Sequence, residues 1–202
     1  MNEGLLVVIS GPSGAGKGTI CRSLTENAKD LELSVSATTR APRIGEIEGK
    51  NYYFIDVEEF KKRVENGEFL EYANVYDNYY GTPKEKVIEK LRTGRTVILE
   101  IDIQGALKVK KSHPEGVFIF VVPPSIDELQ KRIITRATDT IEVIGKRMKC
   151  VKDELDYATE YDYVVMNDSL EEAVSKIRSI IDVEKMRSHR NTDLIKKIGG
   201  ES

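Results

Sequence analysis

The sequence predicts an α/β fold in which a parallel sheet lies between two layers of helices. The prediction rests on short apolar runs that are separated by segments whose apolar residues have the spacing of a helix. The runs cover residues 5–9, 96–101, 117–122 and 163–166. Runs that are apolar throughout indicate strands buried on both faces, which is typical of parallel sheets. Because such strands alternate with helices here, the pattern favours a three-layer core.

A glycine-rich motif directly follows the first apolar run. Gly11, Pro12, Ser13, Gly14, Ala15, Gly16 and Lys17 fit the pattern G-x-x-x-x-G-K. A strand is expected before this motif and a helix over residues 17–27 after it, which is the context of a phosphate-binding loop. Glycines let backbone N–H groups turn toward phosphate oxygens, and the helix N-terminus adds positive potential. A glycine-rich turn without a ligand is the alternative, but the lysine and the flanking elements favour a P-loop NTPase-type core that binds ATP.

The remaining helices and strands are predicted from helix-capping residues and from the glycines and prolines that end regular structure. Strands are expected over 34–39 and 52–55, with a glycine- and proline-containing loop over 40–51. Capping boxes at 56–59 and 82–85 predict helices that end near Gly67 and Gly94. In the second box Thr82 is the cap and Pro83 the first helical residue. Further helices are expected over 126–136, over 140–157 and after Ser169, which is the expected cap of the last helix.

Two regions interrupt the alternation of strand and helix and predict inserted parts. Residues 34–94 are assigned to an inserted lobe and residues 126–147 to a small lid. The core is then made of residues 1–33, 95–125 and 148–202 of a single domain, which is an ordinary size for 202 residues.

The composition excludes several classes of protein. The net charge is −3, so no global basic field would attract nucleic acid or a membrane surface. No apolar run approaches the roughly 20 residues that a membrane-spanning helix needs. Cys21 and Cys150 form neither a metal-binding spacing nor a disulfide framework, which favours a cytoplasmic location. We therefore expect neither a nucleic acid nor a membrane among the partners.

The phosphate loop departs from its motif at one position. Gly18 stands where a Ser or Thr hydroxyl normally contacts Mg²⁺, and Thr19 follows it. We therefore expect no direct protein ligand for the metal. Mg²⁺ commonly keeps several waters, and Glu100 or Asp102 at the end of an apolar run could hold it through water. The alternative is that these two carboxylates are only exposed strand-end acids.

Several segments together resemble guanylate kinase, in order and over about residues 5–190. The most specific are the run T-T-R-A-P-R-I-G-E over residues 38–46 and the run N-Y-Y-G-T over residues 78–82. Phe69–Tyr72, Glu100–Gly105, Lys146–Met148 and Asn167–Asp168 add to them. The resemblance implies a core, a GMP-binding lobe and a lid. It also implies transfer of the γ-phosphate of ATP, with Mg²⁺, to GMP and also to dGMP, by a monomer or homo-oligomer.

The resemblance also implies roles for individual residues. Catalysis would use Lys17, Arg43, Arg136 and Arg147. ATP would contact Gly11 through Thr19, Arg132 as a supporting candidate for the positive charge of the lid, and Asn167 near the adenine. GMP would contact Ser36, Arg40, Arg43, Tyr52, Glu71, Tyr80, Thr82, Glu100 and Asp102. Ala137 stands where the family usually has glycine.

The acceptor residues also have a physical logic of their own. Two guanidinium groups, on Arg40 and Arg43, can clamp one phosphate dianion, and the phenols of Tyr52 and Tyr80 can donate to it. Guanine offers two donors on one edge, and a carboxylate such as Glu71 can accept both. A solvated arginine-containing loop is the alternative for the clamp.

Two other functions remain open at this point. One is a non-catalytic guanylate-kinase-like binding module, although such modules lack working phosphate-loop or acceptor residues that are present here. The other is a P-loop kinase of a different phosphorylated acceptor, such as a sugar phosphate. Glu71 and the run over residues 78–82 argue against the second.

Overall fold

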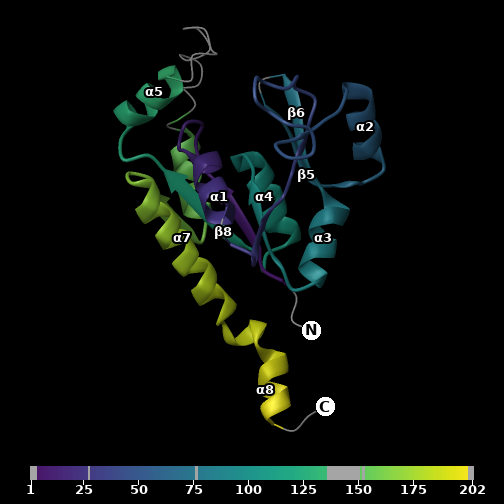
Figure 1. Ribbon diagram of the computed structural model, residues 1–202, viewed down its shortest axis with the longest axis vertical. Coiled ribbons are helices and arrows are strands. Elements are labelled where there is room, and N and C mark those ends of the chain that lie inside the picture. The colour runs from purple at the N-terminus through teal and green to yellow at the C-terminus, as the bar shows by residue number, and fades with distance from the viewer. Residues whose placement is uncertain (1–3, 27, 76, 136–150, 152, 200–202) are drawn as a thin grey trace.

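The computed structural model describes residues 4–26, 28–75, 77–135, 151 and 153–199, without the side chains of residues 133 and 135. A five-stranded parallel sheet forms the core, and a four-stranded sheet forms a lobe above one side of it (Figure 1). In the described part of the chain, no helix has the length and apolar character needed to cross a membrane.

The core sheet has the strand order β2-β7-β1-β8-β9, and all its pairs are parallel. Its strands are β1 (Leu6–Ser10), β2 (Leu31–Leu33), β7 (Thr96–Glu100), β8 (Val117–Val122) and β9 (Tyr163–Met166). Four of the five strands were predicted from apolar runs. The three-residue edge strand β2 was not.

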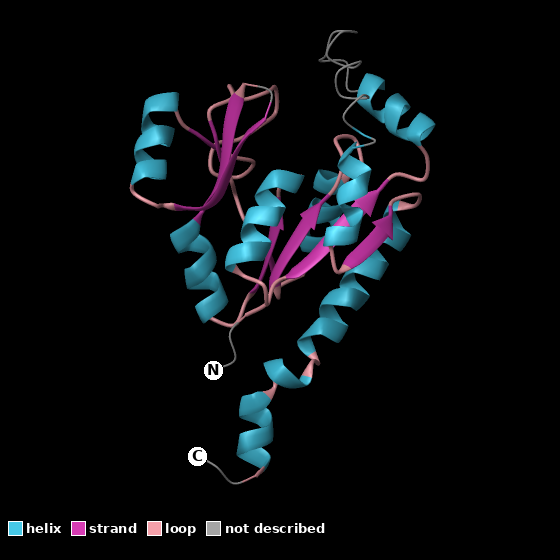
Figure 2. Ribbon diagram, turned by 180° about the vertical axis from the view of Figure 1, so that it is seen from behind, coloured by secondary structure: helices cyan, strands magenta, loops and turns pink. Residues whose placement is uncertain are grey.

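Helices cover both faces of this sheet, which confirms the three-layer prediction (Figure 2). On one face, Val7 and Ile9 of β1 pack with α1 (Lys17–Glu26) and α7 (Leu170–Lys185). On the other face, Leu6 and Val8 pack with α3 (Lys84–Arg92) and α4 (Ile103–Ser112). Alternate residues of β1 thus enter opposite cores, as the period of a strand requires. Helix α4 was not predicted.

Helix α5 (Ile126–Thr135) begins where the sequence predicted a helix. Most of the helix expected over 140–157 lies outside the described residues, although 151 and 153–156 are helical. The chain continues through the 3₁₀ turns η1 (Tyr157–Glu160) and η2 (Ser188–Arg190) to α8 (Thr192–Ile198), which projects away from the body (Figure 1).

The lobe has the strand order β4-β3-β6-β5. Its elements are β3 (Ala37–Thr38), β4 (Tyr53–Phe54), α2 (Val57–Glu65), β5 (Phe69–Val75) and β6 (Asn78–Pro83). Phe60 of α2 fills a small core, where it stacks on Phe69 and Tyr79 at ring-centroid distances of 4.5 and 5.3 Å. The hairpin of β5 and β6 was not predicted.

Two of the predicted helix caps are confirmed and one is wrong. Asp56 accepts from the Glu59 backbone N at 2.8 Å, and Ser169 accepts from the Glu172 backbone N at 3.3 Å. Thr82 does not cap α3, because β6 runs on to Pro83 and Pro83 itself is the N-cap. The Thr82 hydroxyl instead donates to Glu71 at 2.7 Å, so the side chain expected at a helix end belongs to the lobe interior.

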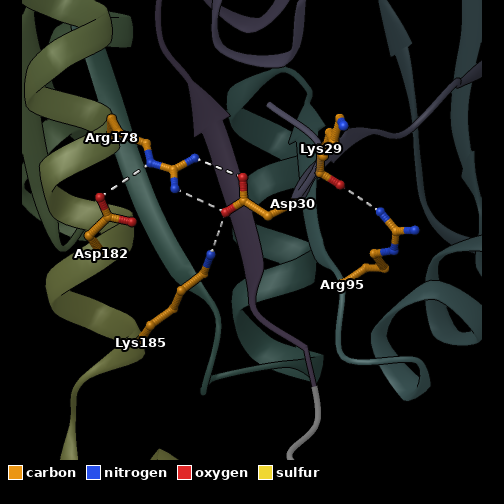
Figure 3. Close-up of polar contacts among 6 residues, drawn as sticks. All are labelled: Lys29, Asp30, Arg95, Arg178, Asp182 and Lys185. Atoms are coloured by element: carbon orange, nitrogen blue, oxygen red, sulfur yellow. Dashed lines mark hydrogen bonds and ion pairs between the residues drawn. The ribbon is translucent and has the colours of Figure 1, made fainter. Parts of the chain in front are cut away.

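A cluster of charged side chains fastens α7 to the loop before β2 (Figure 3). Arg178 donates from both Nη atoms to the Asp30 carboxylate at 3.0 Å, and Lys185 donates to it at 3.0 Å. Arg178 also donates to Asp182 at 3.2 Å. The hydrogen bond from Arg178 is the main reason that the pKa of Asp30 lies well below its usual range.

We expect Asp30→Asn to lower the free energy of unfolding at pH 7 by about 0.5–1 kcal/mol, the range for an exposed but bidentate pair. Because the folded-state pKa of Asp30 is depressed, its contribution is present above the unfolded-state pKa and is lost as the pH falls through the folded-state value. Urea unfolding of wild type and variant from pH 7 to pH 2 measures both effects. Glu172→Gln, which removes an exposed partner of Lys176 on the same helix, should change stability by less than the Asp30 substitution. Equal effects of the two would contradict this expectation.

Candidate active site

The phosphate loop lies between the end of β1 and the start of α1. Gly11, Gly14 and Gly16 all have positive φ, at 141, 87 and 91°. A Cβ at Gly11 would lie 2.2 Å from the Val121 carbonyl oxygen, so no larger residue fits there. Lys17 Nζ donates to the carbonyls of Gly11 and Pro12 at 2.7 and 3.0 Å. The Lys17 ammonium group therefore binds carbonyl groups of the same loop.

Three carboxylates act on Lys17. Burial lowers the pKa of the lysine, while the charges of Glu100, Glu154 and Asp102 act in the opposite direction. Glu100 and Asp102 were predicted to lie beside the loop. Glu154 was not among the candidate residues, because its sequence context carries no motif that would identify it.

The structure gives a physical reason for the glycine at position 18. A Cβ on Gly18 would lie 3.2 Å from Glu100 Oε1 and 3.4 Å from Oε2. The Glu100 carboxylate thus lies against the position where the motif usually carries its hydroxyl side chain. Ile9 and Glu100 are register partners in the parallel β1–β7 pair, so the loop and the carboxylate leave the sheet side by side.

The acidic pair fits a cation that is held through water. Asp102 Oδ1 caps α4 by accepting from the Gly105 backbone N at 2.8 Å, which leaves its second oxygen for other partners. Within the described ranges, no group of three or more His, Cys, Asp or Glu could hold a metal ion. Carboxylate and water oxygens are the ligands that Mg²⁺ prefers, so Glu100 and Asp102 suit it as outer partners.

A cleft of about 490 Å³ adjoins the loop on the side of α5. Its lining residues include Gly14, Gly16, Thr19, Glu128, Lys131, Arg132, Asn167, Asp168 and Leu170. Asn167 and Arg132, both assigned to ATP from the sequence, thus lie at one cavity together with Thr19. Glu128, Lys131 and Leu170 were not identified from the sequence.

Asn167 also holds the phosphate loop in shape. Its Nδ2 donates to the Ala15 carbonyl at 2.8 Å and would lie 2.2 Å from a Cβ on Gly16. Arg132 in turn donates to the Asn167 carbonyl at 3.2 Å and to Glu128 at 3.0 Å. Because Ala15 and Asn167 are far apart in the sequence, no local motif predicts the contact between them.

The predicted arginine clamp is organised by a carboxylate. Arg40 Nη2 donates to Glu46 Oε1 at 2.9 Å, and the Arg43 backbone N donates to Glu46 Oε2 at 2.7 Å. Glu46 therefore bridges the two positions, a role that the sequence did not reveal. The Arg40 guanidinium lies 5.5 Å from the centre of the Tyr52 ring.

The other phosphate-side residues adjoin this clamp. The rings of Tyr52 and Tyr80 meet edge to face at 6.0 Å. Burial, followed by the charge of Glu100, raises the pKa of Tyr52 to about 12. Ser36 lies directly before β3, and its carbonyl accepts from the Tyr53 backbone N at 2.9 Å. Because Glu100 belongs to the core and Tyr52 to the lobe, the lobe site and the phosphate loop face a common space.

Glu71 is a buried carboxylate between the lobe and the core. Only 6% of the residue is exposed, and its Oε1 accepts from Thr82 Oγ1 at 2.7 Å. A Cβ on Gly105 of α4 would lie 2.5 Å from its Oε2. The pKa of Glu71 is raised to about 7, mainly by burial; the Thr82 hydrogen bond lowers it and the charge of Asp102 adds to the rise. A ligand with two donors would favour the charged form, so binding such a ligand would release a proton near neutral pH.

Two catalytic candidates, Arg136 and Arg147, lie outside the described residues. All the other predicted site residues are described. The structure groups them around the carboxyl edge of the core sheet and the facing side of the lobe.

A phosphate loop beside a strand-end acid pair, facing a second lobe in which Glu46 links Arg40 and Arg43, is typical of a P-loop kinase of phosphorylated acceptors. The sequence model of the family "Guanylate kinase" matches residues 3–184. The chain therefore belongs to the guanylate kinase family.

Curated relatives and a solved structure agree with this assignment. The guanylate kinase of Caldanaerobacter subterraneus subsp. tengcongensis is 60% identical over 99% of this chain and 97% of the relative. That of Clostridium acetobutylicum is 58% identical over 96% and 92%. The crystal structure of guanylate kinase from Anaplasma phagocytophilum superimposes with a TM-score of 0.81 at 35% identity, covering 98% of this chain and 96% of that one.

We expect Gly105→Ala to impair use of the acceptor nucleotide without unfolding the protein. Alanine favours a helix by up to about 1 kcal/mol over glycine, but here its Cβ would displace the Glu71 carboxylate. We expect kcat/KM for GMP to fall by about tenfold or more, since small misplacements of a site group are costly. The KM for ATP should stay within about twofold, an order-of-magnitude bound for an untouched site. Gly199→Ala, where a Cβ meets its nearest atom at 3.4 Å, serves as the control. Unchanged kinetics with GMP would show that Glu71 and Gly105 do not constrain each other.

Proposed function

We propose that the chain transfers the γ-phosphate of ATP directly to GMP, with the two nucleotides held on opposite sides of the carboxyl edge of the core sheet. Membership of the guanylate kinase family supports the reaction. The observation that carries the choice of acceptor is the buried Glu71 carboxylate, held by Thr82 and facing Gly105. A non-catalytic binding module would have no need for the phosphate loop, the clamp and this carboxylate together.

The donor side is formed by the phosphate loop and the cleft beside it. Lys17 would exchange its hydrogen bonds to the carbonyls of Gly11 and Pro12 for oxygens of the β- and γ-phosphates. The backbone N–H groups over residues 13–19 would surround these phosphates at the N-terminus of α1. The base of ATP would lie in the cleft near Asn167 and Arg132.

The acceptor side neutralises and orients GMP. Arg40, whose guanidinium is held by Glu46, would clamp the GMP phosphate together with Arg43, and Tyr52 and Tyr80 would be further donors. Ser36 would add a hydroxyl near this phosphate. No protein nucleophile is needed: an oxygen of the GMP phosphate attacks the γ-phosphorus, and the bond to ADP breaks.

Negative charge spreads over the transferred group during this step. We assign its stabilisation to Lys17 and Arg43, and to Arg136 and Arg147 from the proposed lid over 126–147. Glu100 and Asp102 would hold Mg²⁺ through water when it is bound with ATP, and the cation would supply positive charge that neutralises the phosphates.

We also propose the wider setting of the reaction. Residues 34–94 would act as the GMP-binding lobe, with α3 joining it to the core because Val87 and Leu91 pack in the core cluster. Both GMP and dGMP would be accepted, within purine nucleotide metabolism and in the cytoplasm. The enzyme would work as a monomer or homo-oligomer, without nucleic acid or membrane.

Lys17→Met tests the donor side. Removing the ammonium group should lower kcat by about 10²-fold or more, because its contacts with charged oxygens stabilise the transition state. A coupled assay of ADP release with saturating GMP measures this change. Lys176→Met, which removes a charge from an exposed pair on α7, should leave kcat unchanged. Near-normal turnover by a folded Lys17→Met enzyme would refute the assignment of the phosphate loop.

Glu71→Gln tests the identity of the acceptor. The carboxylate can accept from both N1–H and N2–H₂ of guanine, whereas AMP offers neither donor at these positions. We expect kcat/KM for GMP to fall by about 10²-fold, corresponding to the loss of charge-assisted hydrogen bonds worth about 2–3 kcal/mol. The fall should be smaller with IMP, which keeps N1–H but lacks the amino group, and smallest with AMP.

The comparison uses GMP, IMP and AMP with wild type, Glu71→Gln and the control Glu58→Gln. Glu58 is exposed in the first turn of α2 in the same lobe, so it tests for a general effect of lost charge. If Glu71→Gln leaves the ratio of GMP to AMP efficiency unchanged, Glu71 does not read guanine.

A further inference from the structure

Glu154 is a partly buried carboxylate to which the proposed mechanism gives no role. It lies in the helical segment 153–156 that follows the proposed lid. Its Oε2 is buried and has no hydrogen-bond partner among the described residues. The Ser13 backbone N–H donates to the same carboxylate, and the charge of Lys17 stabilises it. The side chain therefore reaches the phosphate loop from a distant part of the chain.

The contact with Ser13 places an anion where phosphate is expected. Backbone N–H groups of such a loop, together with the N-terminus of the following helix, form a site for negatively charged oxygens. A carboxylate satisfies this site by the same chemistry as a phosphate group. Lys17 meanwhile donates to the carbonyls of Gly11 and Pro12, so the loop holds its shape without a nucleotide.

Glu154 and a bound nucleotide would conflict. Glu154 uses one N–H that a phosphate oxygen would take, and its charge would face the phosphates in a poorly solvated site. Asp102 already raises the pKa of Glu154, although burial is the larger cause. Like charges in such surroundings repel strongly. The nucleotide can therefore occupy the whole loop only when the Glu154 carboxylate moves out.

We infer that Glu154 is an intramolecular competitor for the phosphate loop, a carboxylate that must be displaced before the phosphates of ATP can bind. It acts as an affinity-setting residue rather than as a catalytic one. When only a fraction of molecules has an open site, the apparent dissociation constant is the intrinsic constant divided by that fraction. Glu154 thus weakens ATP binding and leaves GMP binding unaffected, because the residues assigned to GMP lie in the lobe, apart from Glu100 and Asp102.

Isothermal titration calorimetry with ATP and with inorganic tripolyphosphate, both without Mg²⁺, tests this inference. Glu154→Gln keeps the shape of the side chain without its charge, and Glu154→Ala removes the group. Both should bind each probe about tenfold more tightly than wild type, the gain expected if about a tenth of the molecules are open. Binding of GMP should stay unchanged.

Asp153→Asn provides the matched control. Asp153 is the exposed neighbour of Glu154, so the variant removes the same charge from the same segment without touching the loop. Its affinities should equal those of wild type. Equal tightening in Asp153→Asn would overturn the inference, because general electrostatics would then explain the gain. Unchanged or weaker binding by the Glu154 variants would overturn it too.

Thermal unfolding checks that the variants fold. If Glu154→Gln and Glu154→Ala do not, Glu154→Asp shortens the side chain and withdraws the carboxylate, and it should also tighten binding of tripolyphosphate. The inference rests on the phosphate loop being the ATP site, which Lys17→Met tests in the same titration. Loss of binding in Lys17→Met without tightening in the Glu154 variants would reject the competitor and keep the ATP site.

Discussion

The parallel pairing of β1 with β7 is the constraint on which the rest of the site depends. Parallel strands end at the same edge of a sheet, so everything that follows them emerges together. Ile9 is the register partner of Glu100, and this pairing sets the phosphate loop against the carboxylates of Glu100 and Asp102. A backbone arrangement thus brings oxygen ligands for a cation next to donors for phosphate. The same pairing places Glu100 beside position 18, where a Cβ would lie 3.2 Å from its Oε1, so a side chain there would require the Glu100 carboxylate to shift.

The acceptor side depends on buried charge rather than on backbone. Glu71 is stable in its position because Thr82 donates to it and because α4 presents only the backbone of Gly105 at the point of contact. The cost of burying this carboxylate is expressed as a pKa raised to about 7. A ligand with two hydrogen-bond donors would stabilise the charged form of such a buried carboxylate more than a ligand with one. The same reasoning explains why Glu46, with two partners of its own, is suited to orient Arg40 and not to read a base.

The core of the fold could be predicted from the sequence because apolar runs mark its central strands, but the lobe could not. In β5 the charged Glu71 occupies a buried position and breaks the pattern expected of a strand. Helix α4 was missed because Asp102, its cap, was interpreted only as a ligand and because Gly105 disfavours helix. The phosphate loop could be predicted from a local motif, whereas the assignment of Glu71 to guanine depends on family resemblance and stays a prediction. The contacts of Asn167 and Glu154 with the loop could not be predicted, since they join residues far apart in the chain.

The contact between Glu71 and Gly105 has a further consequence for the order of events. It lies within the packing of β5 on α4, which joins the lobe to the core together with α3, so a rotation of the lobe either turns about this packing or breaks it. Near a pivot, atoms move little, while the loop with Arg40 and Arg43, elsewhere on the lobe, would sweep through a larger arc. Under such a rotation the base of the acceptor nucleotide would contact Glu71 while the lobe is still open. The phosphate of the acceptor would move toward the core only when the lobe closes. Selection of the substrate and its alignment for reaction would then be two successive stages of a single lobe rotation.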